Sequence, residues 1–159
     1  MLGFAFPLCA SLAAAMAGVA AGVPACVEIK RLFEASIVPV LCALPPAGLA
    51  LLAAGAGLGE EALFRGVLLP LASGSVGAPV ALGATSLLFG ALHAATPLYF
   101  LWATAAGALF GCEWFATGGS LSACAATHAL YDYIAFLVIV RAWGGGQGTP
   151  EQKQQPREL

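Results

Sequence analysis

Long apolar runs dominate this chain and restrict what it can fold into. The first, residues 3–23, contains no acidic or basic residue and is long enough to cross a bilayer, which takes about 20 residues. Over the whole chain, 60% of the residues are hydrophobic, 9% are charged, and the mean hydropathy is +0.91. An ordinary soluble domain carries about 25% charged residues, so this composition excludes one, and it excludes intrinsic disorder as well. A net charge of −2 without any basic run excludes a basic nucleic-acid-binding domain. We therefore predict an integral membrane protein.

The predicted fold is an all-α, polytopic membrane helix bundle with about five transmembrane helices. A secretory signal peptide is the alternative for the first apolar run, but no Lys or Arg precedes it. Residues 24–36 form a water-facing or interfacial segment, and residues 37–44 a partial or re-entrant element, because Pro45 and Pro46 follow at once. A turn is predicted at residues 73–77. The spans are placed at residues 3–23, 47–72, 78–95, 97–116 and 119–141, within a membrane-embedded domain of residues 1–143 that precedes a disordered polar tail of residues 144–159.

Basic residues predict the orientation. By the positive-inside rule, Lys30 and Arg31 after the first span belong in the cytoplasm, and so do Arg141, Lys153 and Arg157 after the last. Four spans between the two groups satisfy this rule, which puts the N-terminus outside and the C-terminus in the cytoplasm. The Ala- and Gly-rich composition favours a bacterial cytoplasmic membrane.

The cysteines show no pattern of chemistry. They are scattered through apolar stretches and contain no CxxC pair, so we interpret them as small packing residues rather than disulfides or a zinc site. They are Cys9, Cys26, Cys42, Cys112 and Cys124.

Several ionisable residues lie inside the predicted spans. On insertion scales, one charge at mid-membrane costs about 2.5–3.5 kcal/mol, so their retention indicates a shared polar site. Three pairs have i, i+4 spacing and therefore share a helix face: Glu61 with Arg65, Phe89 with His93, and His128 with Asp132. A helix-stabilising ion pair remains the alternative for the first pair, and an interhelical hydrogen bond for a single histidine. The residues inside spans are Glu60, Glu61, Arg65, His93, Glu113, His128 and Asp132.

Glu113 is set apart from the others. It lies near the end of its predicted helix beside Trp114 and Phe115, where a long side chain can reach the membrane interface. We therefore leave it out of the predicted site.

Three motifs in order resemble a known family. Residues Glu60 to Arg65 match EExxxR, Phe89 to His93 match FxxxH, and His128 to Asp132 match HxxxN/D. Together they resemble the CPBP family of CAAX proteases and bacteriocin-processing enzymes, also called the Abi family. The resemblance covers residues 47–136. Asp132 stands where Asn is common, and the chain is shorter than many relatives, which bears on substrate handling more than on the chemistry.

The resemblance implies an intramembrane endopeptidase, best known for removing the last three residues after a prenylated cysteine. Glu60 would be the general base on a water that His93 positions. Arg65 would hold Glu61, which orients the site with Phe89 in support. His128 and Asp132 would face the carbonyl oxygen, where a hydrogen-bond donor is needed; Asp132 could donate only if protonated.

No cofactor is favoured. Zinc held by Glu60, His93 and His128 is the alternative, since the family has been described as metalloproteases. The chain has no HExxH motif, and serine and aspartyl chemistry are disfavoured because GxSxG and GxGD are absent.

Two other functions remain open: a non-enzymatic bacteriocin-immunity or scaffold protein of the same fold, and a small transporter or proton relay. The expected partners are the lipid bilayer and a membrane-associated or prenylated peptide or protein, with no nucleic acid. The sequence indicates neither the natural substrate nor the oligomeric state.

Overall fold

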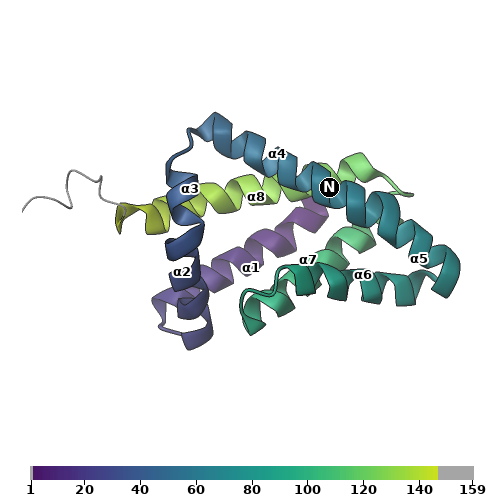
Figure 1. Cartoon of the computed structure of the whole chain (residues 1–159), viewed down its shortest axis with the longest axis horizontal. Coiled ribbons are helices and arrows are strands. Elements are labelled where there is room, and N and C mark those ends of the chain that lie inside the picture. Colours follow the sequence, from purple (N-terminus) through teal and green to yellow (C-terminus); the bar gives the residue numbers. More distant parts are fainter. Residues whose placement is uncertain (1, 147–159) are drawn as a thin grey trace, which may run out of the picture.

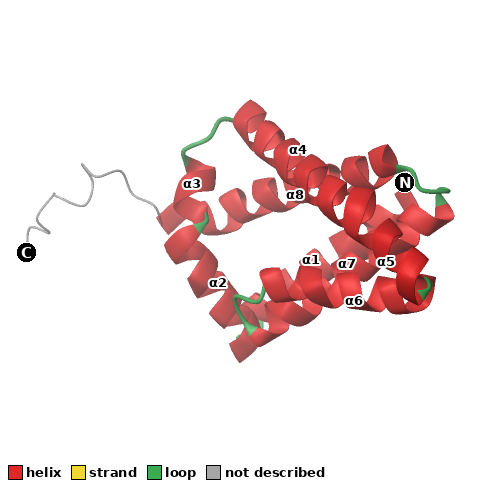
Figure 2. Cartoon of the chain, turned by 45° about the vertical axis from the view of Figure 1, so that its right-hand side comes forward, coloured by secondary structure: helices red, strands yellow, loops and turns green. Residues whose placement is uncertain are grey.

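The computed structural model describes residues 2–146, and these form a helical bundle without a strand (Figures 1 and 2). The all-α membrane bundle predicted from the sequence is confirmed. The helices are α1 (Leu2–Ala20), α2 (Pro24–Ser36), α3 (Val38–Cys42), α4 (Pro46–Leu63), a π-helical turn (Phe64–Leu68), α5 (Leu69–Val76), α6 (Ala78–Leu92), α7 (Pro97–Ala116) and α8 (Leu121–Trp143), before a short 3-10 turn (Gly144–Gly146).

Length and apolar character separate these helices. Among the described residues, three stretches are long and apolar enough to cross a membrane: Gly3–Ala20, Pro46–Val76 and Leu121–Trp143. The second of them joins α4, the π-helical turn and α5. The remaining two predicted spans correspond to α6, a shorter apolar helix, and α7.

The segment before α4 is more helical than predicted. Residues 24–36 form the helix α2 rather than a simple loop, and its Phe33 is buried against Leu49, Ile139 and Trp143. The short helix α3 ends just before Pro45 and Pro46, as those prolines require. Figure 1 shows α2 and α3 standing across one end of the bundle.

The predicted turn at residues 73–77 is wrong in its extent. The helix continues through Val76, and the chain turns only at Gly77, whose φ of +82° favours a residue without a Cβ. Ser73 and Ser75 are therefore helical; Ser75 bonds its hydroxyl to the carbonyl of Leu71 one turn earlier. The predicted tail begins as the 3-10 turn, and residues 147–159, with Lys153 and Arg157, lie outside the described residues.

Capping residues position the last two helices. Thr96 accepts a hydrogen bond from the Tyr99 amide at the start of α7, and Ser120 accepts one from the Ala123 amide at the start of α8. Between them, Gly118 and Gly119 take φ values of +67° and +88° and reverse the chain. The two helices that carry Glu113 and His128 therefore face each other.

Helices α4 and α8 pack side by side at very short range (Figure 1). A Cβ on Gly57 would lie 2.8 Å from the Ala129 amide nitrogen and 2.9 Å from the Ala125 carbonyl oxygen. Small residues at such an interface let two backbones approach closely, as is common between membrane helices. This approach brings the end of α4, with its two glutamates, against His128.

Candidate active site

Six ionisable side chains form a polar cluster with Glu61 at its buried centre. They are Glu60, Glu61, Arg65, His93, His128 and Asp132. The Glu61 side chain is fully buried, and Oε1 accepts hydrogen bonds from Arg65 Nη1 at 2.9 Å and from His128 Nδ1 at 2.9 Å. Arg65 Nη2 donates to the carbonyl oxygen of Gly107. These three bonds connect α4, the π-helical turn, α7 and α8, so Glu61 fixes His128 rather than facing a substrate.

Aromatic rings surround the Arg65 guanidinium, which is buried with only 3% of the residue exposed. It lies 5.7 Å from the ring centre of Phe64 and 5.3 Å from those of Phe89 and Phe110. A buried ion pair is stabilised only when further contacts offset the loss of hydration. The rings and the Gly107 carbonyl supply those contacts here. The π-helical turn that carries Arg65 is the kind of local widening often found at functional sites.

Glu60 points away from Glu61 and toward both histidines. Its Oε2 lies 3.7 Å from His93 Nε2 and 4.0 Å from His128 Nε2, too far for direct hydrogen bonds. Although the side chain is 35% exposed, this oxygen is buried and has no hydrogen-bond partner among the described residues. The Oε2 atoms of Glu61 and Glu113 also have no partner among the described residues, but only Glu60 of the three lines the cavity. A buried acceptor without a partner is costly, so a polar group that enters from the cavity is expected to occupy the position beside Glu60.

The hydrogen bonds of the two imidazoles fix their tautomers. His93 Nδ1 lies 2.7 Å from the Phe89 carbonyl oxygen, which can only accept, so this nitrogen carries the proton. In the neutral ring, Nε2 is then the acceptor and faces Glu60. His128 follows the same pattern, because its Nδ1 donates to the Glu61 carboxylate. The Phe89 ring also stacks on His93, with ring centres 4.4 Å apart.

Asp132 lies beside His128 on α8. Its Oδ2 is 3.6 Å from His128 Nε2, and 19% of its side chain is exposed. The i, i+4 spacing thus places the two residues on one face, as predicted, but their contact is an ion-pair distance rather than a hydrogen bond.

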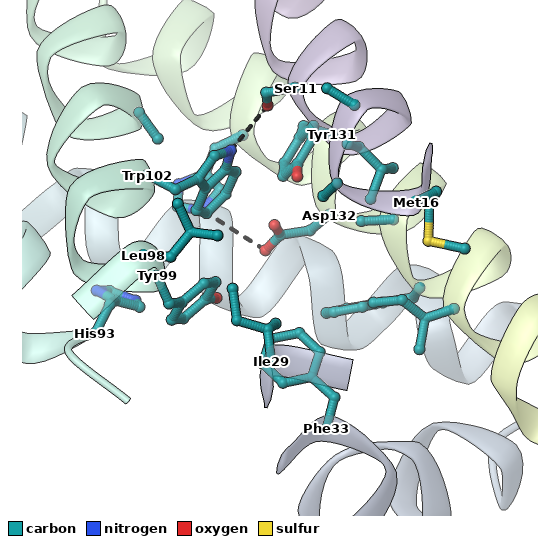
Figure 3. Close-up of a pocket in the computed structure, with 18 of the residues that line it drawn as sticks. Ser11, Met16, Ile29, Phe33, His93, Leu98, Tyr99, Trp102, Tyr131 and Asp132 are labelled. Atoms are coloured by element: carbon teal, nitrogen blue, oxygen red, sulfur yellow. Dashed lines mark hydrogen bonds and ion pairs between the residues drawn. The ribbon is translucent and has the colours of Figure 1, made fainter. Parts of the chain in front are cut away.

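The site opens into a cavity of about 530 Å³. Glu60, His93, His128 and Asp132 form its polar end, and most of the remaining wall is apolar. Figure 3 shows Tyr99 and Trp102 of α7 and Asp132 of α8 pointing into it, with Ile29 and Phe33 of α2 below them in the view. Ligand sites commonly have this size, an apolar wall and a few convergent polar groups.

The donor groups do not form a ready metal site. Among residues 2–146, no group of three or more His, Cys, Asp or Glu side chains is arranged to hold a metal ion. The two nitrogens that face Glu60 stand 3.7 and 4.0 Å from its oxygen. Donor atoms around one tetrahedral zinc lie about 3.3 Å apart, so these distances do not decide the alternative of zinc at Glu60, His93 and His128, which stays a prediction.

The prediction that Glu113 reaches the membrane interface is wrong. Its side chain is fully buried, not directed to the membrane interface, and its Oε1 accepts a hydrogen bond from Thr127 at 2.8 Å. The reason is that α8 packs over this face of α7 and supplies a hydroxyl as a partner. A glutamate in an otherwise apolar helix indicates a buried polar contact, whereas its position near the helix end wrongly suggested the membrane interface.

Two further aromatic residues were not singled out from the sequence. The Phe110 ring stacks on His128 with ring centres 4.6 Å apart, and the Tyr99 ring stands 6.5 Å from His93. Nothing in their local spacing distinguishes them from ordinary apolar residues of a membrane helix. The sequence-predicted residues Glu60, Glu61, Arg65, Phe89, His93, His128 and Asp132 all lie together at this site.

Comparison with known proteins agrees with the motifs. No match to the chain is found among curated proteins or among solved structures. A family model described as type II CAAX prenyl endopeptidase Rce1-like matches residues 43–134, more than half of the chain. The matched segment contains every residue of the polar cluster and leaves α1, α2 and α3 outside. The family membership predicted from the three motifs is therefore confirmed: this chain belongs to the Rce1-like family of type II CAAX prenyl endopeptidases, which are intramembrane proteases.

Proposed function

We propose that the protein hydrolyses a peptide bond of a lipid-modified or membrane-associated substrate with a water activated by Glu60. One observation carries this proposal. Glu60 Oε2 is buried without a hydrogen-bond partner among the described residues, at the polar end of a large apolar cavity and facing both histidines. A water at this position satisfies that oxygen and meets the substrate on the cavity side.

Glu60 and His93 hold and activate the water. The water donates one proton toward Glu60 Oε2 and the other toward the unprotonated Nε2 of His93, which leaves an oxygen lone pair directed into the cavity. Glu60 removes its proton as the water oxygen bonds to the carbonyl carbon, and the carbonyl π electrons move to the carbonyl oxygen. The Phe89 carbonyl keeps His93 in the tautomer this step requires.

His128 stabilises the oxyanion and Glu60 completes the reaction. The carbonyl oxygen becomes an oxyanion, which accepts a hydrogen bond from His128 Nε2 when that ring carries its second proton. As the oxyanion collapses, the C–N bond breaks and the leaving amine takes the proton that Glu60 holds. Glu61 keeps the ring oriented through Nδ1, and Asp132 flanks Nε2 at 3.6 Å.

The proposed mechanism uses no metal. The side chains present supply the base, the water-positioning group and the oxyanion donor, and no step depends on a Lewis acid. Treatment with a chelator tests this part of the proposal separately.

The cavity supports an apolar substrate group. Rings of Phe33, Tyr99, Trp102 and Trp143 line it beyond the polar end. Such a wall suits a hydrocarbon chain attached close to the bond that is cut, since burying it there removes apolar surface from water. A prenylated peptide is the substrate that agrees with the family, and we propose it as the first probe.

The experiment uses purified protein in lipid with a quenched fluorescent prenylated CAAX peptide. Wild type is compared with Glu60→Gln, His93→Ala and the matched control Glu28→Gln, a carboxylate exposed on α2. Removing one catalytic group of this kind lowers kcat by about 10²–10⁴-fold. The control keeps wild-type activity, and mass spectrometry locates the cut after the prenylated cysteine.

The outcomes separate the alternatives. Loss of cleavage in both site variants, with unchanged thermal unfolding, supports the proposal. If a chelator abolishes cleavage by wild type, only the metal-free part of the proposal is refuted. No cleavage of prenylated or other membrane peptides by folded wild type refutes the protease assignment and favours the immunity or scaffold alternative, in which binding survives Glu60→Gln.

The protein is an integral membrane protein, and we propose that it lies in a bacterial cytoplasmic membrane with the N-terminus outside and the C-terminus in the cytoplasm. Lys30 and Arg31 on α2 and Arg141 at the end of α8 support this orientation. Accessibility of an N-terminal epitope tag in intact cells, against the same tag at the C-terminus, tests it.

A further inference from the structure

A second buried carboxylate joins α7 to α8 outside the cluster described above. Glu113 is fully buried, Thr127 is 2% exposed, and the Thr127 hydroxyl donates to Glu113 Oε1 at 2.8 Å. Thr127 directly precedes His128 in the chain. Placing a carboxyl group in an apolar interior is costly, and this one takes no part in the proposed chemistry. Glu113 is therefore expected to act through the residue that it binds, Thr127.

One face of α7 contacts the site at three levels. Gly107, Phe110 and Glu113 are spaced three residues apart and so lie along one side of the helix. The Gly107 carbonyl accepts from Arg65, the Phe110 ring stacks on His128 at 4.6 Å, and Glu113 accepts from Thr127. The arginine, the imidazole and the Thr127 side chain of α8 thus all contact the same helix, α7.

The rotation of α8 about its axis depends on directional contacts. Toward α4, α8 packs Ala125 and Ala129 against Gly57 through van der Waals contact, and the directional contact on that side is the bond from His128 to Glu61, which itself requires the ring to be correctly placed. Toward α7, the Cys124 thiol approaches the Phe110 carbonyl at 3.5 Å, but a thiol is a weak donor. The Thr127–Glu113 bond is the strong directional contact between α7 and α8 in the described part of the chain.

We propose that Glu113 is a positioning residue for His128. Its carboxyl oxygen holds Thr127, fixes the rotation of α8 and thereby keeps the His128 ring between Glu61 and the substrate carbonyl. The effect on catalysis rests on the proposed function, in which His128 bonds the oxyanion. The effect of Glu113 on the position of the His128 ring does not depend on that function.

Matched variants separate the hydrogen bond from the charge. Glu113→Leu and Thr127→Val each remove one partner at similar size, whereas Glu113→Gln and Thr127→Ser each keep an acceptor or a donor in place. We expect the first two to lower kcat by about 10- to 100-fold, because small displacements of a catalytic group have effects of this order. KM stays near its wild-type value, since Tyr99 and Trp102 on the cavity wall are unchanged. The conservative variants restore most of the activity.

The double variant Glu113→Leu/Thr127→Val is expected to be no slower than the worse single variant, because both changes break one bond. Two results overturn the proposal. A lower Tm with unchanged kcat makes the pair merely structural. Equal loss in Glu113→Gln and Glu113→Leu assigns the effect to the carboxylate charge instead.

A spectroscopic measurement keeps this test independent of the protease assignment. The chain has two histidines, so ¹⁵N-histidine labelling gives two imidazole signal sets, assigned with a His128→Asn variant. Glu113→Leu is expected to shift the His128 ring signals and leave those of His93 in place. If wild type cleaves nothing but this shift appears, the proposed function fails and the positioning role stands. An unshifted His128 signal refutes the positioning role whatever the activity.

Discussion

The contact between α4 and α8 at Gly57 allows a prediction with a worked magnitude. A Cβ at this position would meet the Ala129 nitrogen at 2.8 Å and the Ala125 carbonyl oxygen at 2.9 Å. Both are backbone atoms in the middle of a helix, so neither can turn aside as a flexible side chain would. Ordinary contact begins at 3.4 Å, and the difference from 2.8 Å requires Gly57→Ala to move the helices apart by about 0.6 Å.

This displacement acts directly on the polar cluster. Glu61 lies one helical turn after Gly57, and His128 is adjacent to Ala129. Taken along the 2.9 Å bond from His128 Nδ1 to Glu61 Oε1, a shift of about 0.6 Å stretches it to the limit of a hydrogen bond. Overpacking of this kind costs about 1–3 kcal/mol of stability. Because a 1 Å misplacement can reduce turnover about 100-fold, we expect about a 10-fold loss of kcat here.

Thermal unfolding and peptide cleavage measure the two effects, and α4 offers matched controls. Gly55 and Gly59 flank the contact on the same helix, and a Cβ at either meets nothing within 4 Å. Gly55→Ala and Gly59→Ala should therefore keep wild-type activity and a Tm at or above that of wild type, because alanine favours the helix, while Gly57→Ala lowers the apparent Tm by about 2–4 °C per kcal/mol lost. If Gly57→Ala matches the two controls in Tm, the close approach of α4 and α8 argued here is wrong.

Two further substitutions test named contacts. Arg65→Lys keeps the charge but loses the planar guanidinium that reaches both Glu61 and the Gly107 carbonyl. We expect the free energy of unfolding, measured with denaturant, to fall by about 1.5–3 kcal/mol, and an unfolding midpoint and Tm like those of wild type would contradict the two hydrogen bonds. Trp102→Phe removes the 2.8 Å hydrogen bond from the indole nitrogen to Ser11, which joins α7 to α1, and should lower the free energy of unfolding by about 1 kcal/mol. Adding Ser11→Ala to this variant should lower it little further, and fully additive losses in the double variant would contradict the hydrogen bond.

The sequence predicted the part of this structure that helical periodicity encodes. Residues four apart share a face, and Glu61 and Arg65 form the 2.9 Å pair that their spacing indicated. His93 shows where that rule falls short, since its partner is the backbone carbonyl of Phe89 in addition to the ring. Spacing places side chains on a face but does not say which atom each one binds.

Contacts between helices far apart in the sequence could not be predicted from residue spacing. The bond from His128 to Glu61 spans 67 positions and depends on how α8 rotates against α4, which no local pattern specifies. The burial of Glu113 depends likewise on Thr127 lying opposite it. The cost of a buried carboxylate applies wherever the residue lies, so it marks Glu113 as unusual without revealing its partner.

The two adjacent glutamates show how one helix divides structural and chemical work. Successive residues on an α-helix point about 100° apart, so Glu60 and Glu61 cannot face the same surroundings. Glu61 turns into the protein, where Arg65 and His128 both bond its Oε1; its Oε2 also has no partner among the described residues, but Glu61 does not line the cavity and so does not meet a water on the substrate side. Glu60 turns toward the cavity, and its buried Oε2 has no partner within the described residues. The first carboxylate of the motif is thus available for chemistry because the second carries the structural bonds, and exchanging their roles would require rotating α4 away from its contact with α8 at Gly57.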